Sequence, residues 1–523
     1  MRSFLADQYK RKLYGWLLYA FASEVFVIVS LTLFLPVALE QFARDNGYLL
    51  PDKTEPCSSA VASAAEESAR CVVKIGWLWV DSASFSLYVN SMSVALQALT
   101  VISMGGIADH APHRKPLLLF FAFLGSLSAT CFLLLPSTSR VWWLCAVLGI
   151  FANVGFGASV VAMNAYLPEL GRDAPSVMQL AQQEDNEASP LLDPPSPTDE
   201  DESPSNAPKH NARYEAELSR TTSRISSMGI AFGYGAGILM LILALIPVTL
   251  LKGSTWALRL AIGLSGVWWA VFSVIAGALL PSPPTTTSND AAPFALLPAL
   301  LAAWRRLGGM LRPTEIAKLR ITFQYLAAWF LLSDAFTTIT STALLFAKTS
   351  LHMPPSSLII IGVLSPLSGI AGALVWPVVQ RRLGWSNLRV LITLVVGVSL
   401  IPAYGCIGFA GMKVGGLTTP GEMYGLAVVF GSVYGAFQSY ARAFYAELLP
   451  SGEEARWYGL FSITDKSSSF IGPLVVGFIA DVTGNIRYAF FFLIVMIWLA
   501  LPILMTVNVE RGRRDAQNYR YSS

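Results

Sequence analysis

Three charged residues stand inside apolar runs that are long enough to cross a lipid bilayer. Asp465 and Lys466 are neighbours within Gly459–Asp481, and Arg442 lies in the preceding apolar run, Gly425–Leu449. A charged side chain at membrane depth costs about 2.5–3.5 kcal/mol on insertion scales, so it usually faces a partner or a water-filled cavity. Charged groups in this setting predict a polar path through a membrane protein, which makes a transporter the first hypothesis.

The guanidinium of Arg442 is a planar, two-pronged donor that suits a carboxylate. The tenth and eleventh predicted helices carry four ionisable groups in their cytosolic third, namely Arg442, Glu447, Asp465 and Lys466. This depth favours an inner gate of exchanging ion pairs over a substrate site. A static structural pair is the third interpretation.

Two further carboxylates lie near the middle of apolar runs. Glu24 falls within Gly15–Val37, and Asp334 falls within Ile321–Phe346. Desolvation disfavours the charged form of a buried carboxylate, so either residue can take up and release a proton or bind a substrate ammonium. The alternative is a carboxylate that helix packing satisfies, for instance with Ser or Tyr hydroxyls. Both interpretations stay open at this point.

The composition is that of an integral membrane protein. Of 523 residues, 54% are hydrophobic and 13% are charged, against about 25% charged in soluble domains. The net charge of +3 is too small to indicate a nucleic-acid partner, and no basic cluster alternates with aromatic residues. The chain has no Gly-x-Ser-x-Gly, His-Glu-x-x-His or Walker motif, and its four histidines are scattered. We therefore expect no enzyme activity, metal site or cofactor, and lipids as the surroundings.

Windows of about 20 apolar residues predict membrane-spanning helices, because only helices or closed barrels satisfy backbone polar groups in lipid. Twelve such spans are predicted: Gly15–Val37, Ser84–Met104, Pro116–Leu135, Val141–Asn164, Ser226–Leu250, Leu258–Leu280, Ile321–Phe346, Ser357–Gln380, Leu388–Phe409, Gly425–Leu449, Gly459–Asp481 and Ile486–Val507. The chain is thus predicted to be an all-α membrane protein with twelve transmembrane helices.

The spans divide six and six around a Pro-rich cytosolic linker at 281–320. An N-terminal bundle is predicted within 1–280, and a C-terminal bundle with a short cytosolic tail within 321–523. The linker holds a short basic, amphipathic piece that we expect along the membrane surface.

Weak internal repeats support this division, because they fall at equivalent helices of the two halves. Ser23–Phe26 in the first span matches Ser333–Phe336 in the seventh. Asn164–Leu170, at the end of the fourth span, matches Arg442–Leu448 at the end of the tenth.

Lys and Arg gather on one side of the predicted membrane, so the positive-inside rule places both termini in the cytosol. The opposite side carries the long loop Leu39–Val80, which contains Cys57 and Cys71. A disulfide can form between two thiols on that side. Its formation is left open by the sequence.

The cytosolic loop at about 168–224 has a different composition. Its centre, Gln182–Pro208, is rich in acidic residues, Pro and Ser, and is predicted to be disordered. Within it, Glu187 precedes the pair Leu191 and Leu192 by four positions. This spacing resembles the dileucine signals that sorting adaptors read for endosomes, lysosomes and vacuoles, with a chance match as the alternative.

The loop between the second and third spans, Gly105–Lys115, resembles the Gly-x-x-x-Asp-x-x-x-Arg-Lys signature of the major facilitator superfamily. Asp109 and Arg114 would form a conformational latch, since a carboxylate at a helix end can pair with arginines and lock one of two packings. Pro112 and the two histidines of this loop depart from the signature.

Longer runs resemble one family more closely. They are Tyr14-Gly15-Trp16, Ala22–Phe26, Phe34-Leu35-Pro36, Trp329–Thr338 and Phe461–Ser469 followed by Gly472-Pro473. Together they resemble the fungal autophagy-related protein 22 family, vacuolar effluxers of the major facilitator superfamily.

This resemblance implies two pseudo-symmetric six-helix bundles in the vacuole membrane that work by alternating access. It also implies export of neutral amino acids, such as leucine, isoleucine and tyrosine, to the cytosol after autophagic degradation. Protonation of Glu24 or Asp334 in an acidic lumen would couple this export to protons. Two rivals stay open: a carrier of organic anions or other small solutes, and a non-transporting receptor or scaffold.

Overall fold

The computed structural model describes most of the chain, with gaps in several loops and at single positions. The described residues are 2–49, 54–57, 71–76, 78–108, 111–188, 207–251, 254–281, 304–305, 308–351, 353, 355–410, 415–450, 452–469, 471–483 and 485–519.

Helices make up nearly all of the first half. In chain order they are α1 (Arg2–Val25), the π-helix η1 (Phe26–Phe34), α2 (Leu35–Asp45), α3 (Ser82–Ala108), α4 (Ala111–Cys131), η3 (Phe132–Leu134), α5 (Leu144–Asn164), α6 (Leu167–Arg172), α7 (Pro175–Ala188), α8 (Ala207–Leu250) and α9 (Thr255–Leu279).

The second half is also helical. Its elements are α11 (Pro313–Lys318), α12 (Arg320–Thr349), α13 (Pro355–Leu383), α14 (Asn387–Ile407), η5 (Gly408–Ala410), α15 (Pro420–Ala446), α16 (Glu454–Ser468), α17 (Ile471–Thr483), η6 (Ile486–Tyr488), α18 (Ala489–Met505) and α19 (Val509–Gln517).

Every predicted span falls mainly in helical structure. The first runs through α1, η1 and α2 without a break, whereas the eleventh, Gly459–Asp481, is interrupted between α16 and α17. By length and composition, eight helices of the described chain are apolar enough to cross a membrane. The other predicted spans fall in α3, α12, α15 and the α16–α17 pair. Their crossing stays a prediction from the sequence.

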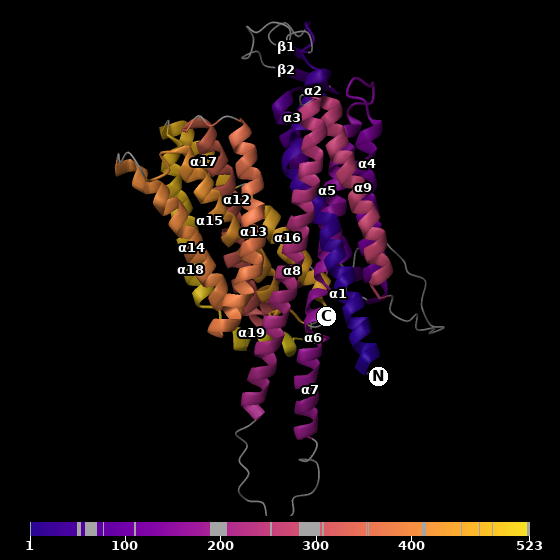
Figure 1. Cartoon of the computed structure of the whole chain (residues 1–523), viewed down its shortest axis with the longest axis vertical. Coiled ribbons are helices and arrows are strands. Elements are labelled where there is room, and N and C mark those ends of the chain that lie inside the picture. The colour runs from indigo at the N-terminus through magenta and orange to yellow at the C-terminus, as the bar shows by residue number, and fades with distance from the viewer. Residues whose placement is uncertain are drawn as a thin grey trace, which may run out of the picture.

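The helices form two bundles that lie side by side (Figure 1). In the first, α1 packs on α8 and α9, and α4 packs on α5 and α9; in the second, α13 packs on α15, and α12 packs on α16 and α18. Across the interface, α8 packs against α13 and α15, while α16 packs against α3 and α5. Both chain termini and α7 lie at one end of the bundles, here called the terminal end (Figure 1).

Close helix approach depends on small residues. A Cβ at Gly155 of α5 would overlap the backbone of Gly125 in α4, and a Cβ at Gly435 of α15 would overlap the backbone of Gly369 in α13. Interfaces without a bulky side chain let membrane helices come into backbone contact. These glycines explain the tight α4–α5 and α13–α15 pairs.

The opposite end, here called the sheet end, carries a small antiparallel sheet in the order β1-β2-β3 (Figure 1). The strands are β1 (Tyr48–Leu49), β2 (Cys71–Ile75) and β3 (Leu78–Asp81), and Leu49 pairs with Cys71 in the register. A disulfide joins Cys57 to Cys71, with Cα atoms 6.1 Å apart. The sheet is an addition to the all-α prediction, since this loop was expected only as a connection.

The acidic loop near the terminal end also differs in part from the prediction. Gln182–Ala188, expected to be disordered, completes α7, and α8 begins at Ala207. Gln, Ala and Glu are good helix formers, so local propensity outweighs the acidic composition at this end of the loop. The remainder of the predicted disordered centre, 189–206, lies outside the described residues.

Candidate functional site

Arg442 binds the opposite half of the molecule. It lies on the buried face of α15, where its Nε and Nη2 donate to the side chain and carbonyl of Ser226 over 3.0 Å each. Its Nη1 donates to Oδ1 of Asn164 at 3.1 Å, and its guanidinium carbon lies 5.3 Å from the ring centre of Trp16. Since Asn164, Ser226 and Trp16 all belong to the first half, Arg442 joins the two halves.

Serines extend this contact between α8 and α15. The Ser226 hydroxyl donates to the carbonyl of Ser439 at 2.9 Å, and the hydroxyls of Ser227 and Ser439 lie 3.0 Å apart. The three side chains are fully buried. Small hydroxyl residues allow two helices to approach closely while satisfying each other's hydrogen bonds.

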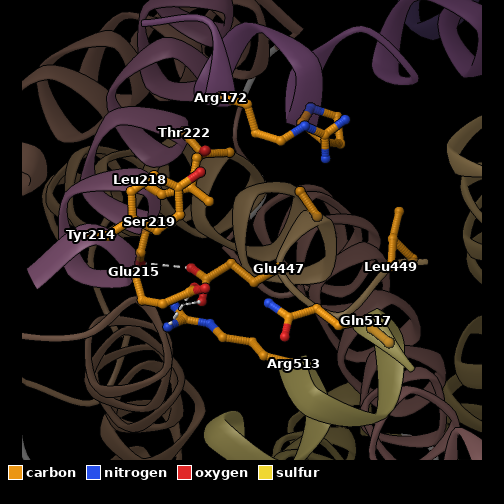
Figure 2. Close-up of a pocket in the computed structure, with 13 residues that line it drawn as sticks. Arg172, Tyr214, Glu215, Leu218, Ser219, Thr222, Glu447, Leu449, Arg513 and Gln517 are labelled. Carbon is orange, nitrogen blue, oxygen red and sulfur yellow. Dashed lines mark hydrogen bonds and ion pairs between the residues drawn. The ribbon is translucent and has the colours of Figure 1, made fainter. Parts of the chain in front are cut away.

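Glu447 is the centre of a second contact between the halves, nearer the terminal end. Its Oε1 accepts from Ser219 of α8 and from Asn387 of α14, each at 2.6 Å. Its Oε2 pairs with Arg513 of α19, which also pairs with Glu215 of α8 at 3.1 Å (Figure 2). Arg513 thus links a carboxylate from each half.

A pocket of about 140 Å³ lies beside this group. Figure 2 shows Arg172, Tyr214 and Gln517 around it, together with the Glu447–Arg513 contact. Burial alone would lower the pKa of Arg513, but the neighbouring glutamates, Glu447 foremost, raise it overall. Arg513 therefore keeps its charge, and the pocket borders a stable ion-pair group.

Arg114 belongs to a third group at the terminal end. Its Nη1 donates to Glu169 of α6 at 3.1 Å, and its Nη2 lies 3.8 Å from Glu454 of α16. Arg172 pairs with the same Glu454 at 3.1 Å, and Lys12 pairs with Glu169. This group crosses between the halves as well, because Glu454 belongs to the second half. Asp109, the predicted partner of Arg114 in the latch, lies outside the described residues.

The predicted gate residues are not all together. Arg442 and Glu447 both contact the first half, but Asp465 and Lys466 lie farther along α16. Tyr458 of α16 donates to the carbonyl of Arg442 at 3.2 Å, and Asp465 follows seven residues later, about 10 Å along the helix axis.

Asp465 contacts its own half. Its carboxylate accepts a hydrogen bond from Ser333 of α12 and pairs with Lys466 at 3.3 Å. The side chains of Asp465 and Lys466 are 25% and 40% exposed, so both reach open space. The pair therefore lies at the depth of Ser333, rather than with Arg442 at the contact between the halves.

Asp334 has a structural partner. Its two carboxylate oxygens accept from the backbone N–H of Gly472 at 3.1 and 2.9 Å, and Thr338 donates to it at 3.3 Å. Gly472 is in the first turn of α17, where backbone N–H groups have no partner inside the helix. Pro473 follows it and has no N–H of its own. Asp334 thus caps α17 at the break in the eleventh predicted span.

Glu24 has no such partner. Within the described part of the chain, its carboxylate makes no hydrogen bond or ion pair, and its side chain is half-buried. Arg442 lies within electrostatic range of it. The helix changes from α to π two residues later, at Phe26, and the backbone N–H of Leu35 donates to the carbonyl of Ser30, five residues before it. Such π segments are rare and occur often at functional sites.

Several residues of these contacts carry no signal of their own in the sequence. Asn164 was marked only as the counterpart of Arg442 in the repeat, and Glu454 follows a helix boundary without a motif. Arg513 lies in a basic C-terminal tail, and the positive-inside rule already accounts for basic residues there. Ser219, inside α8, and Asn387, at the start of α14, are ordinary polar residues. Partners of this kind become visible only when the two halves are placed together.

The predicted sorting signal is largely outside the structure. Leu191 and Leu192 are not among the described residues. Glu187 lies in α7, but nothing is described of its side chain.

Comparison with known families agrees with the fold. A family model described as vacuole effluxer Atg22 like matches residues 8–517. The chain is 42% identical to "Autophagy-related protein 22" of Cryptococcus neoformans var. neoformans, over 96% of this chain and 95% of the relative. It is 38% identical to "Autophagy-related protein 22-1" of Penicillium rubens, over 97% and 91%.

Solved transporter structures share the architecture at low identity. The human organic anion transporter MFSD10 superposes with a TM-score of 0.60 at 15% identity, over 95% of this chain and 99% of that one. FucP, a major facilitator superfamily transporter in the outward conformation, superposes with a TM-score of 0.55 at 13% identity, over 98% and 99%. These similarities show a major facilitator fold.

Proposed function

Because this chain belongs to the Atg22-like family of vacuole effluxers, we propose that it exports neutral amino acids such as leucine, isoleucine and tyrosine from the vacuole lumen to the cytosol. Family and fold identify a transporter rather than an enzyme, in a multi-pass vacuolar membrane setting. The amino-acid cargo, the outward direction and the cytosolic placement of both termini are the proposed part.

The contact of Arg442 with Asn164 and Ser226 is the observation that supports an alternating-access mechanism. Together with the Glu447–Arg513 and Arg114–Glu454 groups, it joins the two halves at the terminal end. With the terminal end in the cytosol, this is the state closed toward the cytosol. Alternating access then requires these contacts to break while the halves rock about the central site.

We assign proton coupling to Glu24 in preference to Asp334. The Asp334 oxygens already accept from Gly472 and Thr338, whereas Glu24 is uncommitted and half-buried. The titratable groups within range of Glu24 are Arg442 and Tyr434 from α15 and Tyr234 from α8. Uptake of a proton in an acidic lumen and release in the cytosol would drive export.

The test uses the full-length protein reconstituted in vesicles. Labelled leucine, isoleucine, tyrosine, lysine, glutamate and glucose are compared with and without a pH gradient. We expect the three neutral amino acids to be transported and the gradient to accelerate them. Transport of none of the amino acids refutes the cargo. Proton-driven transport by the double variant Glu24→Gln, Asp334→Asn refutes the coupling.

A further inference from the structure

We infer that the ammonium group of a zwitterionic amino acid binds at a site shared by the two halves, formed by Glu24, Tyr234, Tyr434 and Asp465. This inference rests on the proposed function and names the groups that would recognise its substrate. The four side chains come from α1, α8, α15 and α16, and each of them is half-buried.

Electrostatic interactions connect these four side chains across the two halves. The Tyr434 hydroxyl lies within electrostatic range of both Glu24 and Asp465, although these carboxylates belong to opposite halves. Tyr234 lies within range of Tyr434 and Glu24. Gln438 donates to the Tyr434 hydroxyl at 2.9 Å and so orients it.

Glu24 packs against α8 at Gly233, which has no side chain. A Cβ at position 233 would overlap Cγ of Glu24, so Gly233 makes room for the carboxylate between α1 and α8. Glu24 has no hydrogen bond in the described chain, while the donors of Arg442 are committed to Asn164 and Ser226. Its oxygens are therefore available to a ligand that donates hydrogen bonds.

When Glu24 is ionised, the charges of Glu24, Arg442, Asp465 and Lys466 sum to zero. Glu24 stands with Arg442, and Asp465 stands with Lys466. A zwitterion adds no net charge to such a surrounding, whereas a free cation or anion would add one in a poorly hydrated space. The two carboxylates suit an α-ammonium, and the partly exposed Lys466 suits the α-carboxylate.

An aromatic wall lies next to these groups in the second half. Trp329 stacks on Phe461 with ring centres 4.4 Å apart, and Phe336 stacks on Phe437 at 3.9 Å. Trp329 also stacks on Phe437 at 5.7 Å, and Phe336 lies 5.6 Å from Tyr434, so the wall is continuous. Phe461 and Tyr434 are its half-buried members. This surface suits the apolar or aromatic side chain of leucine, isoleucine or tyrosine.

The experiment measures exchange of labelled L-leucine by the full-length protein in vesicles, with unlabelled competitors. The competitors are L-leucine and 4-methylpentanoate, which is leucine without its amino group. We expect Glu24→Gln to raise the KM for leucine at least tenfold, with a smaller rise for Tyr434→Phe and Asp465→Asn. Glu24→Asp, which keeps the carboxylate, should recover part of the loss. 4-Methylpentanoate should compete at least a hundredfold more weakly than leucine.

Glu40→Gln is the matched control, because Glu40 lies in α2 and contacts only Arg44 across 3.9 Å among its ion pairs. A wild-type KM in Glu24→Gln, or equal competition by 4-methylpentanoate, overturns the site while wild-type exchange leaves the proposed function standing. If the wild-type protein exchanges no amino acid, both fall together. Gel filtration shows whether each variant folds, and Tyr434→Phe and Asp465→Asn decide the matter if Glu24→Gln does not.

Discussion

Arg442 and Asn164 hold equivalent places in the two halves, and they are bonded to each other: Nη1 of Arg442 donates to Oδ1 of Asn164 over 3.1 Å. The repeat aligns Asn164–Leu170 with Arg442–Leu448. A contact between equivalent positions lies on the pseudo-twofold axis that relates the bundles. The same symmetry relates Glu169 to Glu447. Each of these carboxylates accepts from a residue in the first turn or so of another helix: Glu169 from Arg114 of α4, and Glu447 from Asn387 of α14.

Arg442→Ala should open the terminal end. The substitution leaves Asn164 and Ser226 without their donor, and an unsatisfied buried polar group costs about 1–3 kcal/mol. A loss of 1.4 kcal/mol corresponds to about tenfold in population. We therefore expect a cysteine placed at Thr222, which is buried beside the pocket, to react with maleimide about tenfold faster in a background without free cysteines.

Arg389→Ala, on the exposed side of α14, is the control and should leave the labelling rate of that cysteine unchanged. Wild-type labelling in the Arg442→Ala protein would show that Arg442 does not hold the halves closed.

Arg513→Ala should weaken the same closure from outside the membrane. Its side chain is 18% exposed and joins Glu215 to Glu447, so removal leaves the more buried Glu447 with one cation fewer. We expect faster labelling at Thr222 and a lower melting temperature, by a few degrees. Arg511→Ala is the matched control on the same helix, because Arg511 is 62% exposed and pairs only weakly with Asp515 across 3.8 Å. If the two substitutions change the labelling rate and the melting temperature equally, Arg513 does not specifically hold the two halves together.

Asp334→Ala should destabilise the protein without changing leucine recognition. It removes the acceptor of the Gly472 N–H at the start of α17, and loss of a helix cap costs about 0.5–2 kcal/mol. Thermal unfolding gives the stability, and exchange in vesicles gives the KM. Thr337→Ala serves as control, because Thr337 is exposed and lies next to Thr338 on the same helix. If Asp334→Ala raises the KM for leucine tenfold and leaves the melting temperature unchanged, Asp334 is part of the substrate site and not a helix cap.

The ionised carboxylate of Glu422 should stabilise the folded protein, and this contribution should be lost only at strongly acidic pH. Burial alone would raise the pKa of Glu422, but its hydrogen bonds lower it from 4.5 to about 2. The donors are Leu417 at 2.7 Å, Thr419 at 2.9 Å, Tyr404 at 3.1 Å and Gly415 at 3.4 Å. Because the folded pKa is depressed, the stabilisation is complete above about pH 4.5 and is lost as the pH falls toward 2.

Melting temperatures of the wild type and Glu422→Gln at pH 7, 5 and 3 check this prediction. The wild type should exceed the variant at pH 7 and 5, and the difference should shrink at pH 3. A constant difference at all three values would show that the carboxylate charge is not involved.

Replacement of Leu191 and Leu192 by Ala should change the membrane in which the protein is found and leave its transport of substrate intact. The dileucine pattern belongs to the acidic loop, and none of the contacts between the halves described above uses Leu191 or Leu192. Microscopy of a fluorescent fusion reports the membrane, and exchange in vesicles reports activity. A protein that still reaches the vacuole would mark the pattern as a chance match, whereas loss of transport would favour the scaffold hypothesis.

Hydropathy along the chain was enough to locate the helices, because a span in lipid must hide its backbone and present about 20 apolar residues whatever its neighbours are. The long runs that resemble the family are also continuous stretches of sequence, so they can be recognised without the structure. The break between α16 and α17 did not show, since Gly459–Asp481 reads as one apolar run; it depends on the capping of Gly472 by Asp334, which is 138 residues away. The sheet was likewise hidden, because its pairing joins Leu49 to Cys71 across a long loop.

For the candidate site, the sequence by itself selected the ionisable residues, since a charge inside an apolar span stands out by type alone. Only the tertiary structure separated their roles. Arg442 meets Asn164 across 278 residues, Asp465 meets Ser333 across 132, and Glu24 meets no partner in the described chain. A residue's type tells what it can donate or accept, but its partner depends on how two bundles pack, and packing is a property of the whole chain.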